Sequence, residues 1–230
     1  MTELHDLQVG DRSIAYRLRK GGSPTLVFFP GYASDMEGTK ALALDAFAER
    51  QRLSLLRFDY SGTGSSSGRF DDGTLALWLE ESLAVADQLT QGPLIPIGSS
   101  MGGWIALHLA QLRRERVQAL VGIAVAPDFT DWGFADAQSA DRAGIAGGFW
   151  ESGQRLRLLG QEIAIDCPVR LVHGERDADV PLDIAFRTMR ALRSADVQLN
   201  VIKGGGHRLS EPHEIDAILR TVAALLEPAP

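Results

Sequence analysis

The stretch Leu94-Ile95-Pro96-Ile97-Gly98-Ser99-Ser100-Met101-Gly102 decides how the rest of the chain is interpreted. Its apolar start predicts a buried strand, and the residues from Met101 to Leu112 have apolar side chains at helical spacing. The G-x-S-x-G pattern between them suits a nucleophile on a sharp strand-to-helix turn, because small residues on either side let the turn close. The helix also points its N-terminal dipole at developing negative charge. We therefore predict Ser100 as a nucleophile; the alternative is a glycine-rich packing turn.

On both sides of this turn, apolar runs alternate with amphipathic stretches. The predicted strands are 26–29, 53–58, 94–97, 119–125, 169–173 and 197–202, and the predicted helices are 39–52, 75–89, 101–112, 182–193 and 211–226. Residues 7–19 alternate more weakly and predict an antiparallel hairpin. Continuous apolar strands separated by helices predict an α/β fold, with a mostly parallel twisted sheet covered by helices on both faces. Residues 128–166 have no strand signal, and we expect them to form a short lid insertion within a single domain, 1–230.

Composition excludes several classes of protein. A net charge of −7 over 230 residues disfavours nucleic-acid binding and attraction to anionic membranes. The single cysteine, Cys167, cannot form an internal disulfide, and it excludes zinc sites with several thiolates. With no H-E-x-x-H motif and no complete G-x-G-x-x-G motif, we expect no metal and no cofactor. No apolar run reaches the ~18 residues of a spanning helix. Because the first residues do not resemble a signal peptide, we expect a cytoplasmic location.

A serine nucleophile needs a base to accept its proton, and the chain contains five histidines. His207 follows a glycine-rich run just after a predicted strand, where the catalytic loops of a parallel sheet gather. Its late position fits the chain order serine, acid, histidine. His213, in the first turn of the last helix, is its competitor. We interpret His108 as a helix-surface or packing residue and His173 as a structural hydrogen-bonding residue.

The acid that orients the histidine should lie between the two, after a strand. The run from His173 to Pro181 offers Glu175, Asp177 and Asp179. Asp177 suits the catalytic role and Asp179 suits the N-cap of the next helix, but spacing does not separate them.

A tetrahedral oxyanion needs preorganised donors. We predict one at the backbone N–H of Met101, directly after the serine. The second candidate is the N–H of Tyr32, in the loop that follows the strand 26–29, where Gly31 permits a turn. The alternative is a plain glycine turn that presents no donor.

Several motifs together resemble the α/β-hydrolases. They are Phe29-Pro30-Gly31-Tyr32, Gly38-Thr39-Lys40-Ala41-Leu42-Ala43, Arg57-Phe58-Asp59-Tyr60-Ser61-Gly62-Thr63-Gly64-Ser65-Ser66, Gly98-Ser99-Ser100-Met101-Gly102-Gly103-Trp104 and His173-Gly174 with Asp177. More narrowly, they resemble the α/β-hydrolase-domain protein ten family of mitochondrial acyl-protein thioesterases and its bacterial relatives. The resemblance covers nearly the whole chain and is weakest in 128–166.

The resemblance implies Ser100 as nucleophile, Asp177 as acid and His207 as base, and so decides between Asp177 and Asp179. It also implies hydrolysis of S-palmitoyl groups from protein cysteines and of some acyl-glucuronide esters. We expect no segment like the transit peptide of those relatives, so the resemblance is not extended to their compartment.

We therefore expect a serine hydrolase that cleaves acyl esters or thioesters through an acyl-enzyme. Aromatic residues of the lid are candidates for an apolar acyl site, with packing onto the core as the alternative: Trp132, Phe134, Phe149 and Trp150. The competing enzyme hypotheses are a small-molecule carboxylesterase, an acyl-glucuronide esterase and a C–C bond hydrolase. A non-catalytic ligand-binding protein of the same fold is the competitor from another class. Neither acyl length nor oligomeric state follows from the sequence.

Overall fold

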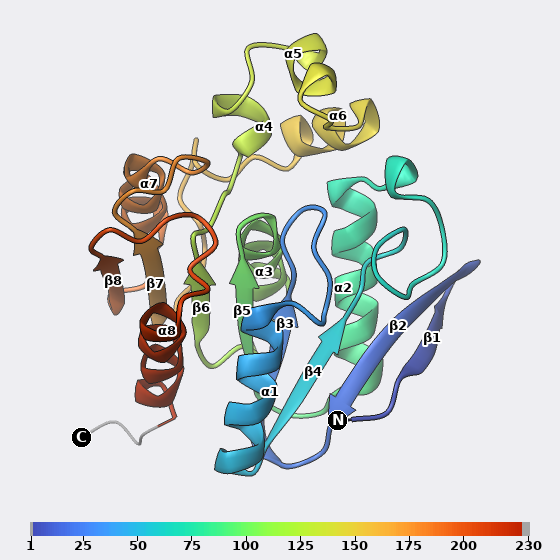
Figure 1. The fold of residues 1–230 in the computed structure, drawn as a ribbon, viewed down its shortest axis with the longest axis vertical. Helices are drawn as coiled ribbons and strands as arrows, with labels where there is room; N and C mark the ends of the chain where they lie inside the picture. Colours follow the sequence, from blue (N-terminus) through green and yellow to red (C-terminus); the bar gives the residue numbers. More distant parts are fainter. Residues whose placement is uncertain (1, 227–230) are drawn as a thin grey trace.

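The computed structural model describes residues 2–226, which are built around one eight-stranded sheet (Figure 1). The strand order is β1-β2-β4-β3-β5-β6-β7-β8. The strands are β1 (His5–Val9), β2 (Arg12–Arg19), β3 (Gly22–Phe29), β4 (Leu53–Phe58), β5 (Leu94–Ser99), β6 (Leu120–Ile123), β7 (Val169–Gly174) and β8 (Val197–Ile202). The first two form an antiparallel hairpin, β2 pairs antiparallel with β4, and all later pairs are parallel.

The strand order reverses next to β3. The chain runs from β3 to β4 on one side and then places β5 on the other side of β3. At such a switch point the loops that follow the two strands separate, and ligands of open α/β sheets bind in the resulting crevice. The loops after β3 and β5 carry Tyr32 and Ser100, so the sheet topology places both predicted site loops at this crevice.

Helices cover both faces of the sheet. The helices of the described residues are α1 (Thr39–Gln51), α2 (Leu75–Leu89), α3 (Met101–Leu112), α4 (Phe129–Trp132), α5 (Ala137–Arg142), α6 (Gly147–Arg155), α7 (Leu182–Ala191) and α8 (Pro212–Ala224), with a 3₁₀ turn at Phe70–Asp72. Figure 1 shows α1 and α8 side by side on one face, with α2 and α3 on the other. Each face buries its own apolar core. None of the helices in residues 2–226 is long and apolar enough to cross a bilayer.

The predicted α/β fold is therefore confirmed, and most differences from the sequence prediction lie at element ends. Helices α2 and α3 have the predicted bounds, because their apolar stripes are long and regular. The strand predicted over 119–125 is shorter, since β6 ends at Ile123. Ala124 has a φ of 46°, which an extended strand does not allow.

Residues 128–166 contain the short helices α4, α5 and α6, which lie beyond the carboxyl ends of β5 and β6 (Figure 1). Hydrogen bonds join the two ends of this segment to each other and to helix α3. The buried carboxylate of Asp128 accepts hydrogen bonds from the backbone N–H groups of Leu158 and Leu159, each at 2.7 Å. The Leu156 carbonyl lies within hydrogen-bond distance of Trp104 Nε1 (3.1 Å) and His108 Nε2 (2.9 Å), both on α3. The start of the segment is thus bound to its end, and the end is anchored to α3.

Candidate active site

Ser100 occupies a strained turn between β5 and α3. Its backbone has φ 54° and ψ −121°, outside the regions that non-glycine residues favour. Although it occupies the N-cap position of α3, its side chain makes no capping hydrogen bond. The turn is fixed by a hydrogen bond from the Ser100 N–H to the Ile123 carbonyl at 2.9 Å. The Ser100 hydroxyl therefore lies at the switch-point crevice and is free to form a hydrogen bond with another side chain.

That side chain is His207, in the loop between β8 and α8. Its Nε2 lies 3.0 Å from Ser100 Oγ, and its Nδ1 lies 2.9 Å from Asp177 Oδ2. The His207 side chain is 22% exposed, whereas that of Asp177 is fully buried. A continuous hydrogen-bond chain thus joins a hydroxyl, an imidazole and a carboxylate from three separate loops, and its inner end is shielded from solvent.

The Asp177 carboxylate is held in its ionised form. Its Oδ1 accepts the backbone N–H groups of Asp179 (3.0 Å) and Val180 (2.8 Å). Burial alone would raise its pKa, but the hydrogen bonds from His207 and Val180 outweigh burial and keep the pKa of Asp177 below its ordinary value. An ionised carboxylate at Nδ1 orients the ring and stabilises the imidazolium.

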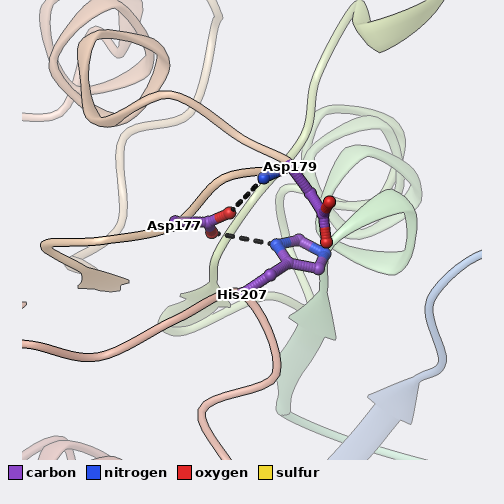
Figure 2. Close-up of side chains that lie close together, drawn as sticks. All are labelled: Asp177, Asp179 and His207. Carbon is purple, nitrogen blue, oxygen red and sulfur yellow. Dashed lines mark hydrogen bonds and ion pairs between the residues drawn. The ribbon is translucent and has the colours of Figure 1, made fainter.

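The other two acids of the same turn lie elsewhere. Glu175 accepts the Gly204 N–H at 2.8 Å and so fixes the loop before His207. Asp179 does not cap α7 as the sequence suggested, because the N-cap residue is Pro181 and no side chain caps that helix. Figure 2 shows the Asp179 carboxylate on the side of the imidazole away from Asp177. It is exposed and lines a cavity that also reaches Ser100 and His207.

Asp177, Asp179 and His207 are also the group whose side chains could offer ligand atoms to a metal, all within 4.8 Å of one another. His207 Nδ1 and Asp177 Oδ2 already form a hydrogen bond with each other (Figure 2). The hydrogen-bond chain therefore explains why His207 and Asp177 lie close together, and the exposed Asp179 carboxylate stands outside that chain.

The remaining histidines lie away from Ser100. His173 is buried and its Nε2 bonds the Val180 carbonyl at 2.9 Å, which matches the structural role expected for it. His108 bonds the Leu156 carbonyl, and burial lowers the pKa of its ring. His5 is on the edge strand β1, and His213 is in the first turn of α8.

The loop after β3 lies directly against Ser100. A Cβ atom added to Gly31 would meet the Ser99 carbonyl oxygen at 3.4 Å and Ser100 Cβ at 3.5 Å. Ala33 in the same loop has a φ of 54°, so the loop turns back sharply. Within residues 2–226, no backbone carbonyl accepts the N–H of Tyr32 or of Met101. Both predicted donors thus flank Ser100 with their hydrogens uncommitted, as an oxyanion hole requires.

Gly102 permits the close approach of α3 to this loop. A Cβ at that position would lie 2.1 Å from the Phe29 carbonyl oxygen and 2.3 Å from that of Pro30. We expect Gly102→Ala to lower the free energy of unfolding by about 3 kcal/mol, because two backbone segments would have to separate. Urea unfolding measures this change. Gly160→Ala is the matched control, since nothing lies within 4 Å of a Cβ there. Equal stability of the two variants would contradict this account of the turn.

An apolar cavity of about 510 Å³ opens beside Ser100 under the 128–166 segment. Trp132 and Phe134 line it, as the sequence suggested. Phe149 and Trp150 are not on its wall: Phe149 is fully buried in the core, stacked against Phe129 with ring centroids 5.7 Å apart. Instead, Phe129 and Ile145 complete the apolar wall, and the sequence analysis missed both. Both lie in the segment that has no regular hydrophobic period, so only their apolar character could have indicated them.

Comparison with known proteins identifies the class that this fold and site define. The model of the family described as alpha/beta hydrolase fold matches residues 24–141, about half of the chain. The chain belongs to this family and is a serine hydrolase of ester or thioester bonds.

Among individual proteins, it is 35% identical over 235 residues to the human protein named palmitoyl-protein thioesterase ABHD10, mitochondrial. That match covers 94% of this chain and 77% of the human protein. The solved structure of mouse alpha/beta hydrolase domain-containing protein 10 superposes with a TM-score of 0.91 at 33% identity, covering 97% of this chain and 98% of that one. A protein from Agrobacterium vitis S4 gives a TM-score of 0.91 at 37% identity, covering 99% and 100%. The resemblance found in the sequence is thereby confirmed.

One prediction from the sequence is wrong. The cytoplasmic location is contradicted, because the human, orangutan and bovine relatives that match 94% of this chain are named as mitochondrial proteins. The prediction depended on the first residues, the absence of a long apolar run and the cysteine count, and these features do not distinguish one aqueous compartment from another.

Proposed function

We propose that Ser100, His207 and Asp177 are the catalytic triad of an acyl thioesterase that also cleaves esters. The observation that carries the proposal is the hydrogen-bond chain from Ser100 Oγ through His207 to Asp177, on a strained turn beside an apolar cavity. A turn that only packed against the core would not require a serine at φ 54° or an imidazole within hydrogen-bond distance of its hydroxyl.

In the first half of the reaction, Ser100 Oγ attacks the acyl carbonyl carbon while His207 Nε2 accepts the hydroxyl proton. The carbonyl oxygen becomes an oxyanion, which the N–H groups of Met101 and Tyr32 stabilise. Asp177 stabilises the imidazolium. Collapse of the intermediate breaks the bond to the leaving thiol or alcohol, which takes the proton from His207, and the acyl group remains on Ser100.

In the second half, a water molecule attacks the acyl-enzyme. His207 now accepts the water proton, and the same two N–H groups stabilise the second oxyanion. Collapse returns the proton to Ser100 Oγ and releases the carboxylic acid. The proton transfers use Ser100 and His207, which already lie within hydrogen-bond distance of each other, with Asp177 at the other ring nitrogen.

The acyl chain occupies the apolar cavity, with residues 128–166 acting as a lid within one catalytic domain. The cavity reaches Ser100 and His207, and Phe129, Trp132, Phe134 and Ile145 form its apolar wall. Its volume of about 510 Å³ lies in the usual range for small-molecule sites. The relatives named as palmitoyl-protein thioesterases support long acyl chains on a protein cysteine as the substrate class.

A chain-length series tests this proposal. We expect kcat/KM for acyl thioesters of one neutral thiol to rise with acyl length up to about fourfold per methylene, because each buried CH₂ contributes about 0.8 kcal/mol. The rise ends where the cavity is filled. A parallel series of p-nitrophenyl esters measures the preference for sulfur over oxygen. Activity confined to acetyl and butyryl groups in both series would contradict a long-acyl site.

A matched pair of phenylalanine variants locates the acyl chain. Phe134 lies on the cavity wall, whereas Phe186 on α7 is 39% exposed and lies off that wall. We expect Phe134→Ala to lower kcat/KM for a palmitoyl thioester about tenfold while acetyl thioester hydrolysis changes little, because only the long chain reaches the lost ring. Phe186→Ala should leave both rates unchanged. Equal effects of the two variants would place the acyl chain elsewhere.

A further inference from the structure

A second cavity, of about 370 Å³, opens from Ser100 and is polar. Its walls are the loop after β3, the first turn of α1 and the loop that follows His207. The polar side chains on these walls include Tyr32, Ser34, Asp35, Thr39, Lys40, Arg208 and Ser210. The polar and apolar cavities have only Tyr32, Ser100 and His207 in common. The nucleophile therefore lies where two cavities of opposite character meet.

The chemistry of the reaction assigns the two cavities to the two halves of the substrate. In a tetrahedral intermediate the acyl chain and the leaving group are different substituents on one carbon, so they extend in different directions from Ser100. If the apolar cavity holds the acyl chain, the polar cavity is the space left for the leaving group.

Two cationic side chains lie in this polar cavity. Lys40 is half-buried, and its ammonium donates a hydrogen bond to the backbone carbonyl of Arg208. An ammonium has three N–H donors, so two remain for another partner. The Arg208 guanidinium is exposed. Among the described residues, no carboxylate lies within the 4.0 Å ion-pair distance of either cation.

The acidic groups near the cavity offset these charges only in part. Asp35 also lines it, and its carboxylate, which accepts the backbone N–H of Glu37 at 2.9 Å, sets one negative charge against the two positive ones. Glu214 is buried, accepts the backbone N–H of Glu211 at 2.9 Å, and acts on Lys40 only through its charge. Burial of Lys40 outweighs that charge and lowers the pKa of its ammonium. The ammonium is thus under-compensated, and a bound anion would stabilise it.

We propose that Lys40 and Arg208 form a leaving-group subsite that recognises a negatively charged group, a carboxylate or a phosphate, close to the thiol or alcohol that Ser100 displaces. The subsite selects substrates by what the acyl group is attached to, independently of acyl length. This proposal rests on the proposed function, since it needs Ser100 to be the nucleophile.

The test compares octanoyl thioesters of four small thiols. They are 3-mercaptopropionamide (neutral), 3-mercaptopropionate (carboxylate), 2-mercaptoethyl phosphate (phosphate) and thiocholine (cationic). Division of each kcat/KM by the rate of the reaction with hydroxylamine, a neutral nucleophile, removes the intrinsic reactivity of the thioester. We expect the anionic thioesters to be favoured about tenfold over the neutral one and thiocholine to be disfavoured.

Charge variants decide whether the two cations cause this preference. Arg208→Gln and Lys40→Gln should each lower the ratio of anionic to neutral kcat/KM at least threefold, and Arg208→Glu should reverse it. Lys40→Gln keeps an N–H donor for the Arg208 carbonyl, so it removes the positive charge while preserving that hydrogen bond. Arg50→Gln, in the last turn of the same helix, removes an equal charge away from the cavity and should leave the ratio unchanged.

The outcomes separate this inference from the proposed function. Hydrolysis of the neutral thioester with the same ratio in wild type, Arg208→Gln and Lys40→Gln would overturn the subsite and leave the thioesterase intact. No hydrolysis of any of the four thioesters, with no labelling of Ser100 by a fluorophosphonate, would overturn the proposed function itself. A larger ratio for phosphate than for carboxylate, or the reverse, supports the subsite and identifies which anion it prefers.

Discussion

Ser100→Ala is expected to reduce kcat about 10⁴- to 10⁶-fold for every acyl thioester and ester, because the attacking oxygen is removed and only binding and the oxyanion donors remain. The fold should be unaffected, since the Ser100 side chain caps no helix and its backbone bond to Ile123 is retained. Steady-state kinetics of the purified variant measure the loss, and circular dichroism checks the fold.

Fluorophosphonate labelling supplies an independent readout of the same variant. The wild-type enzyme should gain one adduct on the peptide that contains Ser100, and Ser100→Ala should gain none. Labelling that persists in Ser100→Ala, or full activity in that variant, would show that another residue is the nucleophile. The absence of any adduct in the wild type would favour the non-catalytic alternative.

Asp177→Asn is expected to lower kcat about 10⁴-fold, because an amide leaves the imidazole in the wrong tautomer and no longer stabilises the imidazolium. The substitution keeps an oxygen that can accept the Asp179 and Val180 N–H groups, so the turn should persist. The measurement is kcat with a palmitoyl thioester, alongside thermal unfolding.

Asp179→Asn is the matched control, two residues away on the same turn. The Asp179 backbone N–H bonds to Asp177, and that bond does not depend on the Asp179 side chain. Since the side chain is exposed, loss of its charge should change kcat no more than about threefold. Equal losses in the two variants would mean that the turn as a whole, and not the carboxylate at Nδ1, supports His207.

The sequence was most informative where apolar side chains recur at a regular spacing. Helices α2 and α3 were predicted with their observed bounds because their apolar positions recur along one face. The strand–turn–helix context around Ser100 was equally readable, since a nucleophile on a sharp turn requires small flanking residues. These local patterns predicted the α/β fold, but not the order of its strands.

Features that depend on distant pairing were not predictable in the same way. Spacing could not separate Asp177 from Asp179, because both follow β7 in one turn and only the folded chain places Asp177 against His207 Nδ1. Lys40 and Arg208 meet across 168 positions of sequence. In 128–166 no period distinguishes a cavity wall from core, so Phe149 was expected in the acyl site and Phe129 was overlooked.

The most direct test of the central claim is to trap the acyl-enzyme. The enzyme is mixed with excess palmitoyl thioester, quenched with acid within milliseconds and digested for mass spectrometry. We predict one palmitoyl group, located on Ser100. Cys167 is the competing acceptor, but burial raises the pKa of its thiol to about 11, so it remains protonated and weakly nucleophilic. A palmitoyl group on Cys167, or rapid turnover with no acyl group on Ser100, would contradict the account.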